Sequence, residues 1–332
     1  MNAHSQTSTL RRGFTTGTSA AAAAIAAFLM CRNKHASESV AVCLPGGNCL
    51  DITIAELDEC SAAVIKDAGD DPDVTDRALI RVRLSSDAVA DPRDHIESRG
   101  KGTLIIRGGN GVGTVTRPGL DVPPGKWAVN PGPRRIIADN LALHGFGLET
   151  ESLLLEISVP DGELIAARTL NPTLGVTGGI SILGNSGYVE PFSNDAYIQT
   201  IRLQINSAAA VDNSIIGLST GGRSIDSLRR DCPGLHDRNS FRIGDFIAES
   251  LLAASRAAVR HIVLACMPGK LYKYACGYHN THAHKVKMDM TLLLELLTPF
   301  QPGEHVLESI RRCQTIGEAA SYLDPALFHN IL

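Results

Sequence analysis

Apolar and polar positions alternate along several segments of the first half of the chain. In residues 76–85, Ala78, Ile80, Val82 and Leu84 recur at every second position. A period of two is typical of a half-buried β-strand. β-rich segments separated by turn residues predict further strands at 38–44, 50–57, 60–67, 101–107 and 151–159.

Two segments of this half predict helices instead. Residues 18–32 are rich in alanine, and the hydroxyl side chains of Thr15 and Thr16 precede them, as is typical of a helix start. Residues 134–143 form the second predicted helix. Because strands outnumber helices, we predict a β-rich α+β domain for residues 1–170.

The pattern changes after about residue 178, where predicted strands and helices alternate. The predicted strands are 180–183, 214–219 and 261–266, and the predicted helices are 194–207, 242–257 and several from 282 onward. This order is typical of a parallel sheet covered by helices. We therefore predict a Rossmann-like three-layer α/β domain for residues 171–332.

Each predicted strand of the second half ends in a glycine-containing loop. Ligands of such sheets bind beyond the carboxyl ends of the strands, where glycine lets the backbone approach a nucleotide-like ligand. The sequence therefore predicts a ligand site formed by the loops 184–187, 219–223 and 267–270. A loop such as Gly184-Asn-Ser-Gly187 also fits a plain turn that closes a buried strand, so no single loop identifies a ligand.

Composition narrows the classes of function. The net charge of −4 and an aromatic content of 5% argue against a nucleic-acid partner. The alanine-rich run 19–29 is shorter than the about 20 apolar residues that span a bilayer, so we expect no membrane segment. Eight cysteines without a CxxC pair predict reduced, mostly buried thiols in a cytoplasmic protein.

Three histidines follow the last of these loops. His282 shares a helix face with His279 but not with His284, and no HExxH motif is present. We therefore predict no protein-bound metal. One of the histidines is a candidate general base or substrate contact, and the alternative is a structural role for all three.

Charged residues are concentrated in two other places. The acidic loop 64–74, which includes Asp67 and Asp70, fits either a turn capped by aspartates or a Ca²⁺ or Mg²⁺ site. Basic residues such as Arg117 and Arg134 lie in a glycine- and proline-rich region. They are either solvated or donors to a ligand with several carboxylates.

Short motifs occur along nearly the whole chain, at 10–24, 66–75, 115–120, 130–134, 169–175, 178–191, 269–271 and 281–282. In sequence and in order, this series resembles the CbiD family, the cobalt-precorrin-5B C1-methyltransferases of anaerobic cobalamin biosynthesis. The resemblance implies S-adenosylmethionine as methyl donor and a ring-contracted cobalt tetrapyrrole as acceptor. The second domain would hold the donor.

The resemblance and the loops together define candidate site residues. The candidate catalytic residues are His282, Thr281 and Asp67. The candidate donor-binding residues are Gly184, Asn185, Ser186, Gly187, Glu190, Thr220, Gly221, Gly269 and Lys270. The candidate acceptor-binding residues are Arg11, Thr15, Thr16, Thr18, Asp70, Arg117 and Arg134.

The chain departs from the family pattern at three places. Ser19 stands where the family usually has cysteine, and Lys287 and Asp289 reverse the charges that the family usually has in the segment 283–289. Residues 231–240 also lack the family's usual acidic approach to the segment that begins at Gly244. These departures leave open a CbiD-like paralogue that uses the same donor on another acceptor. A tetrapyrrole-binding protein without catalysis is a further alternative, and the oligomeric state stays open, with a homodimer among the options.

Overall fold

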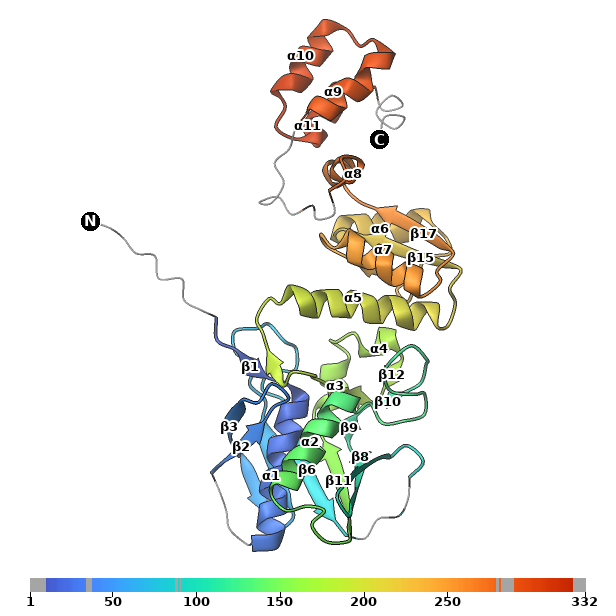
Figure 1. Cartoon of the computed structure of the whole chain (residues 1–332). Helices are drawn as coiled ribbons and strands as arrows, with labels where there is room; N and C mark the ends of the chain where they lie inside the picture. Colours follow the sequence, from blue (N-terminus) through green and yellow to red (C-terminus); the bar gives the residue numbers. More distant parts are fainter. Residues whose placement is uncertain are drawn as a thin grey trace, which may run out of the picture. The chain divides into compact units, whose positions relative to one another are not determined.

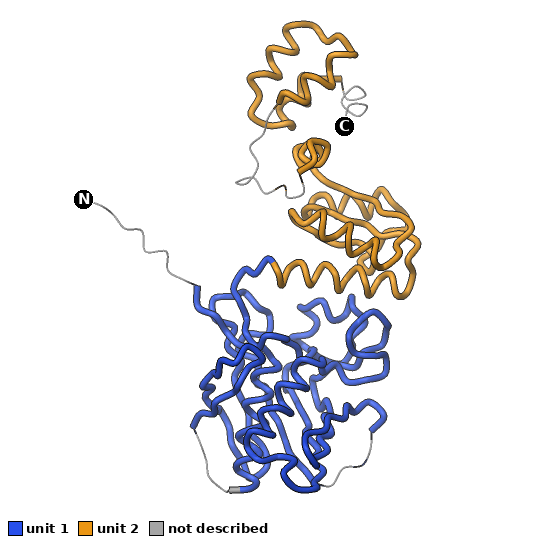
Figure 2. Tube along the Cα trace, in the orientation of Figure 1, with its two compact units in different colours: residues 1–194 blue, residues 195–332 orange. Residues whose placement is uncertain are grey.

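The structure of the protein is a computed structural model that describes residues 10–33, 38–86, 89, 91–278, 281 and 290–324. The chain forms two compact units, residues 1–194 and 195–332, which are described separately (Figure 2). This division falls later in the chain than the boundary at 170 expected from the sequence. Both units mix helices and strands, so the mixed α/β composition is confirmed.

A six-stranded sheet forms the centre of unit 1 (Figure 1). The central strands β6 (Leu79–Ser85) and β11 (Glu151–Ser158) pair antiparallel, and β11 pairs in parallel with β8 (Gly102–Gly108). The other strands are β4 (Glu56–Asp58), β5 (Ser61–Ile65) and β7 (His95–Arg99), in the order β4-β5-β6-β11-β8-β7. Ile80, Val82 and Leu84 are buried, as the alternation predicts.

Helices α1 (Thr16–Asn33) and α2 (Pro131–Leu143) pack against each other (Figure 1). Helix α1 also contacts β5 and β6. Ala20, Ala24 and Ala27 of α1 are completely buried. Alanine side chains allow a close approach of helix to sheet, so the alanine run is the centre of the unit 1 core. The predicted helix at 18–32 is therefore confirmed.

A hairpin of β2 (Ser39–Cys43) and β3 (Cys49–Thr53) also belongs to unit 1. Cys43 and Cys49 are register partners and form a disulfide. The prediction that all eight cysteines are reduced is therefore wrong for this pair. The two cysteines do not form a CxxC motif, but the hairpin places them directly opposite each other. Among the free cysteines of the described residues, only Cys313 is buried.

Short strand pairs and helices complete unit 1. The pairs are β1 (Gly13–Phe14) with β14 (Tyr188–Val189), β10 (Thr114–Val115) with β12 (Val176–Thr177), and β9 (Gly111–Val112) with β13 (Gly179–Ile180), and the helices are α3 (Gly162–Ala166) and α4 (Asn171–Leu174). The predicted strand 180–183 is thus wrong as the first strand of the second domain. Ile182 bridges to Val129 instead, so this apolar run is buried in unit 1.

Unit 2 contains a three-stranded parallel sheet in the order β16 (Ser240–Arg242), β15 (Ile215–Ser219), β17 (His261–Ala265). Ile216 and Leu218 pack in one core with residues of α5 (Asn194–Ala209) and α7 (Ile247–Arg256). Gly217, between them, faces Leu228 of α6 (Gly222–Asp231): a Cβ on Gly217 would lie 2.6 Å from that side chain. Helices therefore cover both faces of the sheet.

Two predicted elements of this unit differ from the structure. The predicted helix 242–257 is a short strand that ends at Arg242, followed by α7 from Ile247. Helix α6 was not expected at all. Most of its residues are polar and it buries only Ser224, Ile225 and Leu228, which leaves little hydrophobic periodicity to detect.

The remaining helices of unit 2 are α8 (Pro268–Ala275), α9 (Thr291–Leu297), the 3₁₀ helix η1 (Thr298–Phe300), α10 (Glu304–Arg312) and α11 (Ile316–Ala320). A separate small core joins them and includes Tyr272, Leu293 and Ile310. Among the helices that the structure describes, none is long and apolar enough to cross a membrane.

Candidate functional site

The carboxyl ends of the three strands of unit 2 bring three loops together. Ser219 ends β15, Gly244 and Asp245 follow β16, and Cys266 follows β17. The backbone N–H of Thr220 donates to the carbonyl of Ala265 at 3.2 Å, which ties the first loop to the third. Two of the three predicted loops, 219–223 and 267–270, therefore lie at one edge of the sheet.

Asp245 is the centre of a polar cluster at this edge. The Lys270 Nζ lies 3.1 Å from the Asp245 Oδ1 and also donates to the carbonyl of Gly244. The hydroxyl of Thr281, a residue only 2% exposed, donates to the same Asp245 Oδ1 at 2.7 Å. The cluster thus joins Lys270 and Thr281, two residues singled out by the sequence, through an aspartate that was not.

Helix α8 adds two further polar side chains to this cluster. Lys273 is 7% exposed, and its Nζ donates to the carbonyl of Thr281 at 3.1 Å. Tyr274 lies near Asp245 and Cys266, and burial raises the pKa of its hydroxyl. Burial also raises the pKa of the Cys266 thiol, so both groups stay protonated near neutral pH.

Gly221 provides an accessible stretch of backbone beside the cluster. Its φ of −173° is extended, and a Cβ built on it would meet no atom within 4 Å. The Ser219 hydroxyl donates to the Gly221 carbonyl at 2.9 Å and holds the turn before α6. Open space above a helix start at a strand end fits the approach of a nucleotide-like ligand.

The loop that contains Gly184 and Gly187 lies in unit 1, not at the edge of the parallel sheet. It packs against the first turn of α1: Thr18 Oγ1 donates to the Gly187 carbonyl at 2.8 Å, and Leu183 N donates to Thr16 Oγ1 at 2.9 Å. Thr15 N also donates to the Gly187 carbonyl. The predicted position of this loop at the edge of the parallel sheet is therefore wrong, because its strand pairs with β9 instead of β15.

Thr15, Thr16 and Thr18 are all buried, at 6%, 2% and 0% exposure. Their hydroxyls are used within the protein, Thr15 Oγ1 lying 3.1 Å from Thr18 Oγ1. Ser19, one departure from the family pattern, is buried too and donates to the Thr15 carbonyl at 3.0 Å. The threonine hydroxyls bind one another and the loop 183–187, so they do not line an open surface.

Arg11 connects the two predicted aspartates of the acidic loop. Its guanidinium donates to Asp67 Oδ1 at 2.9 Å, and its backbone N–H donates to Asp70 Oδ2 at 2.6 Å. The hydrogen bond from Arg11 lowers the pKa of Asp67. Sequence reasoning placed all three on the acceptor or catalytic side, and the structure places them in contact with one another.

A buried ion pair supports the same loop. The ammonium of Lys66 is 1% exposed and lies 2.8 Å from Asp73 Oδ2. Burial alone would raise the pKa of Asp73, but attraction to Lys66 and hydrogen bonds from Lys66 and Thr75 lower it overall. The pair fixes the turn from which Asp67 and Asp70 project.

Glu190, Arg134 and Arg117 are the other predicted charged site residues of unit 1. Glu190 pairs with the exposed Arg12 at 3.0 Å. Arg134 lies 3.1 Å from Glu97, and burial lowers the pKa of its guanidinium. Arg117 packs beside Gly175, so that a Cβ on that glycine would lie 2.8 Å from the arginine stem.

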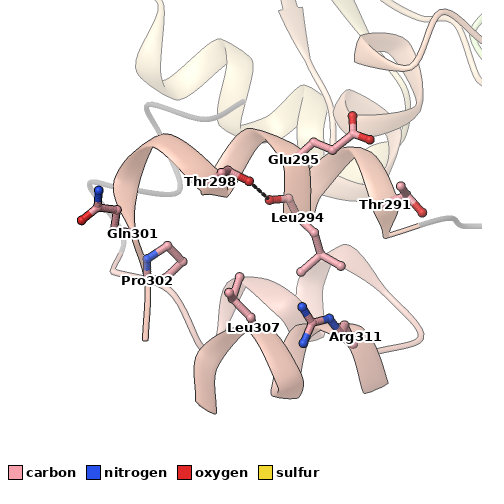
Figure 3. Close-up of a pocket in the computed structure, with 8 residues that line it drawn as sticks. All are labelled: Thr291, Leu294, Glu295, Thr298, Gln301, Pro302, Leu307 and Arg311. Carbon is pink, nitrogen blue, oxygen red and sulfur yellow. Dashed lines mark hydrogen bonds between the residues drawn. The ribbon is translucent and has the colours of Figure 1, made fainter. Parts of the chain in front are cut away.

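A pocket of about 300 Å³ lies among the last helices (Figure 3). Its lining residues are Thr291, Leu294, Glu295, Thr298, Gln301, Pro302, Leu307 and Arg311, none of which was predicted as a site residue. Within the described ranges, no group of three or more histidine, cysteine, aspartate or glutamate side chains is placed to hold a metal ion.

Comparison with known proteins identifies the family. The CbiD family profile matches residues 3–191. The chain belongs to the CbiD family. A relative from Pelobacter propionicus is 37% identical over 96% of this chain and 87% of its own length. A second, from Polaromonas naphthalenivorans, is 37% identical over 95% of this chain and 85% of its own, and both are named cobalt-precorrin-5B C(1)-methyltransferase.

A relative from Geotalea daltonii carries the same name and is 38% identical over 92% of this chain and 85% of its own. A crystal structure of the cobalamin biosynthesis protein CbiD from Archaeoglobus fulgidus is 27% identical, covers 83% of each chain, and has a TM-score of 0.45. The resemblance seen in the motifs is therefore confirmed at the level of the family.

Some CbiD-type motif residues lie where the structure gives no description. His282, the candidate base, and its neighbours His279 and His284 lie outside the described residues. Sequence reasoning missed Asp245 and Tyr274. Asp245 follows a strand of only three residues, so its position after a strand end is the one signal that the sequence offers for it. Tyr274 is identified by the burial of its hydroxyl, which the sequence does not show.

Proposed function

We propose that this CbiD-family chain transfers a methyl group from S-adenosylmethionine to C1 of cobalt-precorrin-5B, or of a closely related cobalt tetrapyrrole, in cobalamin biosynthesis. The observation that carries the proposal is the identity of 37% to relatives of that name over 95–96% of the chain, which spans both units. A Rossmann-like character for unit 2, a cytoplasmic location and the absence of a protein-bound metal are parts of the same proposal.

The edge of the parallel sheet in unit 2 is the proposed donor site. Thr220 and Gly221 offer backbone at the start of α6, and Gly269 and Lys270 lie in the first turn of α8. Open space at Gly221 supports a close approach of the ligand. The polar cluster around Asp245, in which the Lys270 ammonium pairs with the Asp245 carboxylate, lies at the same edge.

Unit 1 is the proposed acceptor side. Arg11, Arg117 and Arg134 are its candidate partners for tetrapyrrole carboxylates, since guanidinium groups bind carboxylates with two parallel hydrogen bonds. We propose that Thr15, Thr16 and Thr18 position the loop 184–190 and do not contact the acceptor, because their hydroxyls are already bonded in the protein. The loop, with Asn185, Ser186 and Glu190, is reassigned to this side because it folds in unit 1.

Methyl transfer from a sulfonium requires an in-line carbon nucleophile and no covalent help from the protein. The new C–C bond forms as the S–CH₃ bond breaks, and S-adenosylhomocysteine leaves. Positioning the two reactants supplies several kcal/mol of the barrier reduction. The protein's task is to hold and desolvate them.

A base is useful if a proton leaves the acceptor. Asp67 is a weak candidate near neutral pH, because the hydrogen bond from Arg11 keeps the pKa of its carboxyl low. Thr281 is a positioning residue in this proposal, since its hydroxyl donates to Asp245. His282 remains the proposed base, on its match to the family motif alone.

The proposal is tested by incubating the protein with methyl-labelled S-adenosylmethionine and cobalt-precorrin-5B, followed by mass analysis of the tetrapyrrole. We expect the label in the product, with a mass increase of one CH₂. Donor binding without labelled product would favour a paralogue that methylates another acceptor. Tetrapyrrole binding without donor binding would favour a binding protein without catalysis.

A further inference from the structure

Helix α8 carries two tyrosines that belong to different cores. Tyr272 is 2% exposed and packs with Leu293 and Leu297. Its hydroxyl oxygen accepts a hydrogen bond from the backbone N–H of Leu293 at 3.2 Å. Tyr274 instead packs against the core formed by β15, α5 and α7. One tyrosine therefore fastens α9 to α8, and the other points back toward the sheet.

The hydroxyl of Tyr274 is buried and, among the described residues, has no hydrogen-bond partner. Thr281 lies beside it, but the Thr281 hydroxyl donates to Asp245. Leaving a buried hydroxyl without a partner costs free energy, because the hydrogen bond that it made to water is lost on folding. Within the described part of the chain, unit 2 thus keeps an unfavourable feature next to Thr281 and Asp245.

The charges around Tyr274 indicate what kind of group it would bind. The ammonium of Lys270 is paired with Asp245. The buried ammonium of Lys273 has a backbone carbonyl as partner, and no carboxylate within the described part of the chain lies within salt-bridge distance of it. A buried cation without a carboxylate partner among these described residues favours the binding of an anion. Lys273 and Tyr274 both lie at Thr281, so a protonated phenol there is placed to donate a hydrogen bond to the same anion.

We propose that the Tyr274 hydroxyl donates a hydrogen bond to the carboxylate at the amino-acid end of the methyl donor, beside the ammonium of Lys273. This inference rests on the proposed function, because it takes S-adenosylmethionine as the ligand of this edge. It places the amino-acid end of the donor at α8, and the nucleoside end on the side of Gly221.

The test compares Tyr274→Phe with Tyr272→Phe, two variants that each remove one oxygen from the same helix. Calorimetric titration with S-adenosylhomocysteine should show about a tenfold weaker affinity for Tyr274→Phe, the value typical of one hydrogen bond to a charged group. Its melting temperature without ligand should be equal to or above that of the parent, because the unpartnered hydroxyl is gone. Tyr272→Phe should show the opposite: a lower melting temperature and parental affinity.

A second ligand, 5′-methylthioadenosine, locates the contact because it lacks the amino-acid end. The tenfold difference between parent and Tyr274→Phe should disappear with this ligand. An equal loss for both ligands would overturn the carboxylate assignment. Parental affinity of Tyr274→Phe for S-adenosylhomocysteine, or a lower melting temperature, would overturn the role of Tyr274 while the proposed function stands. If the parent itself fails to bind S-adenosylhomocysteine, the proposed donor is wrong as well.

Discussion

At the scale of single residues, Gly184 is constrained by its backbone and by its neighbour. Its φ of +123° lies outside the region that side chains usually adopt, and a Cβ would lie 2.3 Å from the Thr15 hydroxyl oxygen. We predict that Gly184→Ala lowers the free energy of unfolding by about 2 kcal/mol. Urea denaturation measures this change in the free energy of unfolding. Gly46→Ala is the matched control, because a Cβ there meets nothing within 4 Å.

A Gly184→Ala protein as stable as the Gly46→Ala control would contradict this reading of the loop. In that case Thr15 moves away at little cost, and Gly184 becomes available as a ligand contact. The sequence pattern alone does not separate the two roles, because glycine before a predicted helix fits ligand binding and tight packing equally well.

The pair Lys66–Asp73 makes a prediction about pH. Asp73→Asn leaves a buried ammonium without its partner and should lower the free energy of unfolding by about 3 kcal/mol at pH 7. Since the folded-state pKa of Asp73 is lowered, its stabilisation is complete above the unfolded pKa near 3.8 and is lost as the pH falls through the folded pKa. The parent and the variant should therefore converge in acid.

Denaturation of both proteins between pH 7 and acidic pH checks this convergence. Asp231→Asn serves as control, because the Arg230–Asp231 pair is exposed on both sides, and it should change stability by less than about 0.5 kcal/mol. A gap between parent and Asp73→Asn that stays constant at every pH would show that the variant acts through packing and not through charge.

At the scale of elements, the sequence predicted what local patterns encode. Strand β6, helix α1 and the parallel strands β15 and β17 all appear near their predicted positions. The pairing of residues 179–180 with β9 depends on contacts far away along the chain, so the same apolar run also fitted a strand of the second domain. Asp245 was missed for a related reason: only the fold places it beside Lys270 and Thr281.

Helix α1 provides the prediction at this scale. Ala24 is completely buried in the core that α1 shares with α2 and the sheet. Ala24→Leu adds three carbons where no space is left and should cost about 3 kcal/mol of unfolding free energy. Ala275→Leu, at an exposed position of α8, is the control and should stay within about 0.5 kcal/mol of the parent. Equal stabilities of the two variants would mean that the alanine core is loosely packed.

At the scale of the whole molecule, two units with separate cores imply two unfolding events. The core around α1 belongs to residues 1–194, and the core around β15 belongs to residues 195–332. Each unit should melt cooperatively on its own, so that a single two-state transition does not describe the chain. A ligand or a substitution then shifts the transition of the unit on which it acts.

This separation tests the assignment of donor and acceptor sides by calorimetry. S-adenosylhomocysteine at a hundred times its Kd should stabilise the unit that binds it by about 2.7 kcal/mol and raise one transition only. Gly184→Ala should lower the other transition, because Gly184 lies in unit 1. If the ligand instead raises the transition that Gly184→Ala lowers, the donor binds in unit 1, and the loop 184–190 regains the donor role that its sequence first suggested.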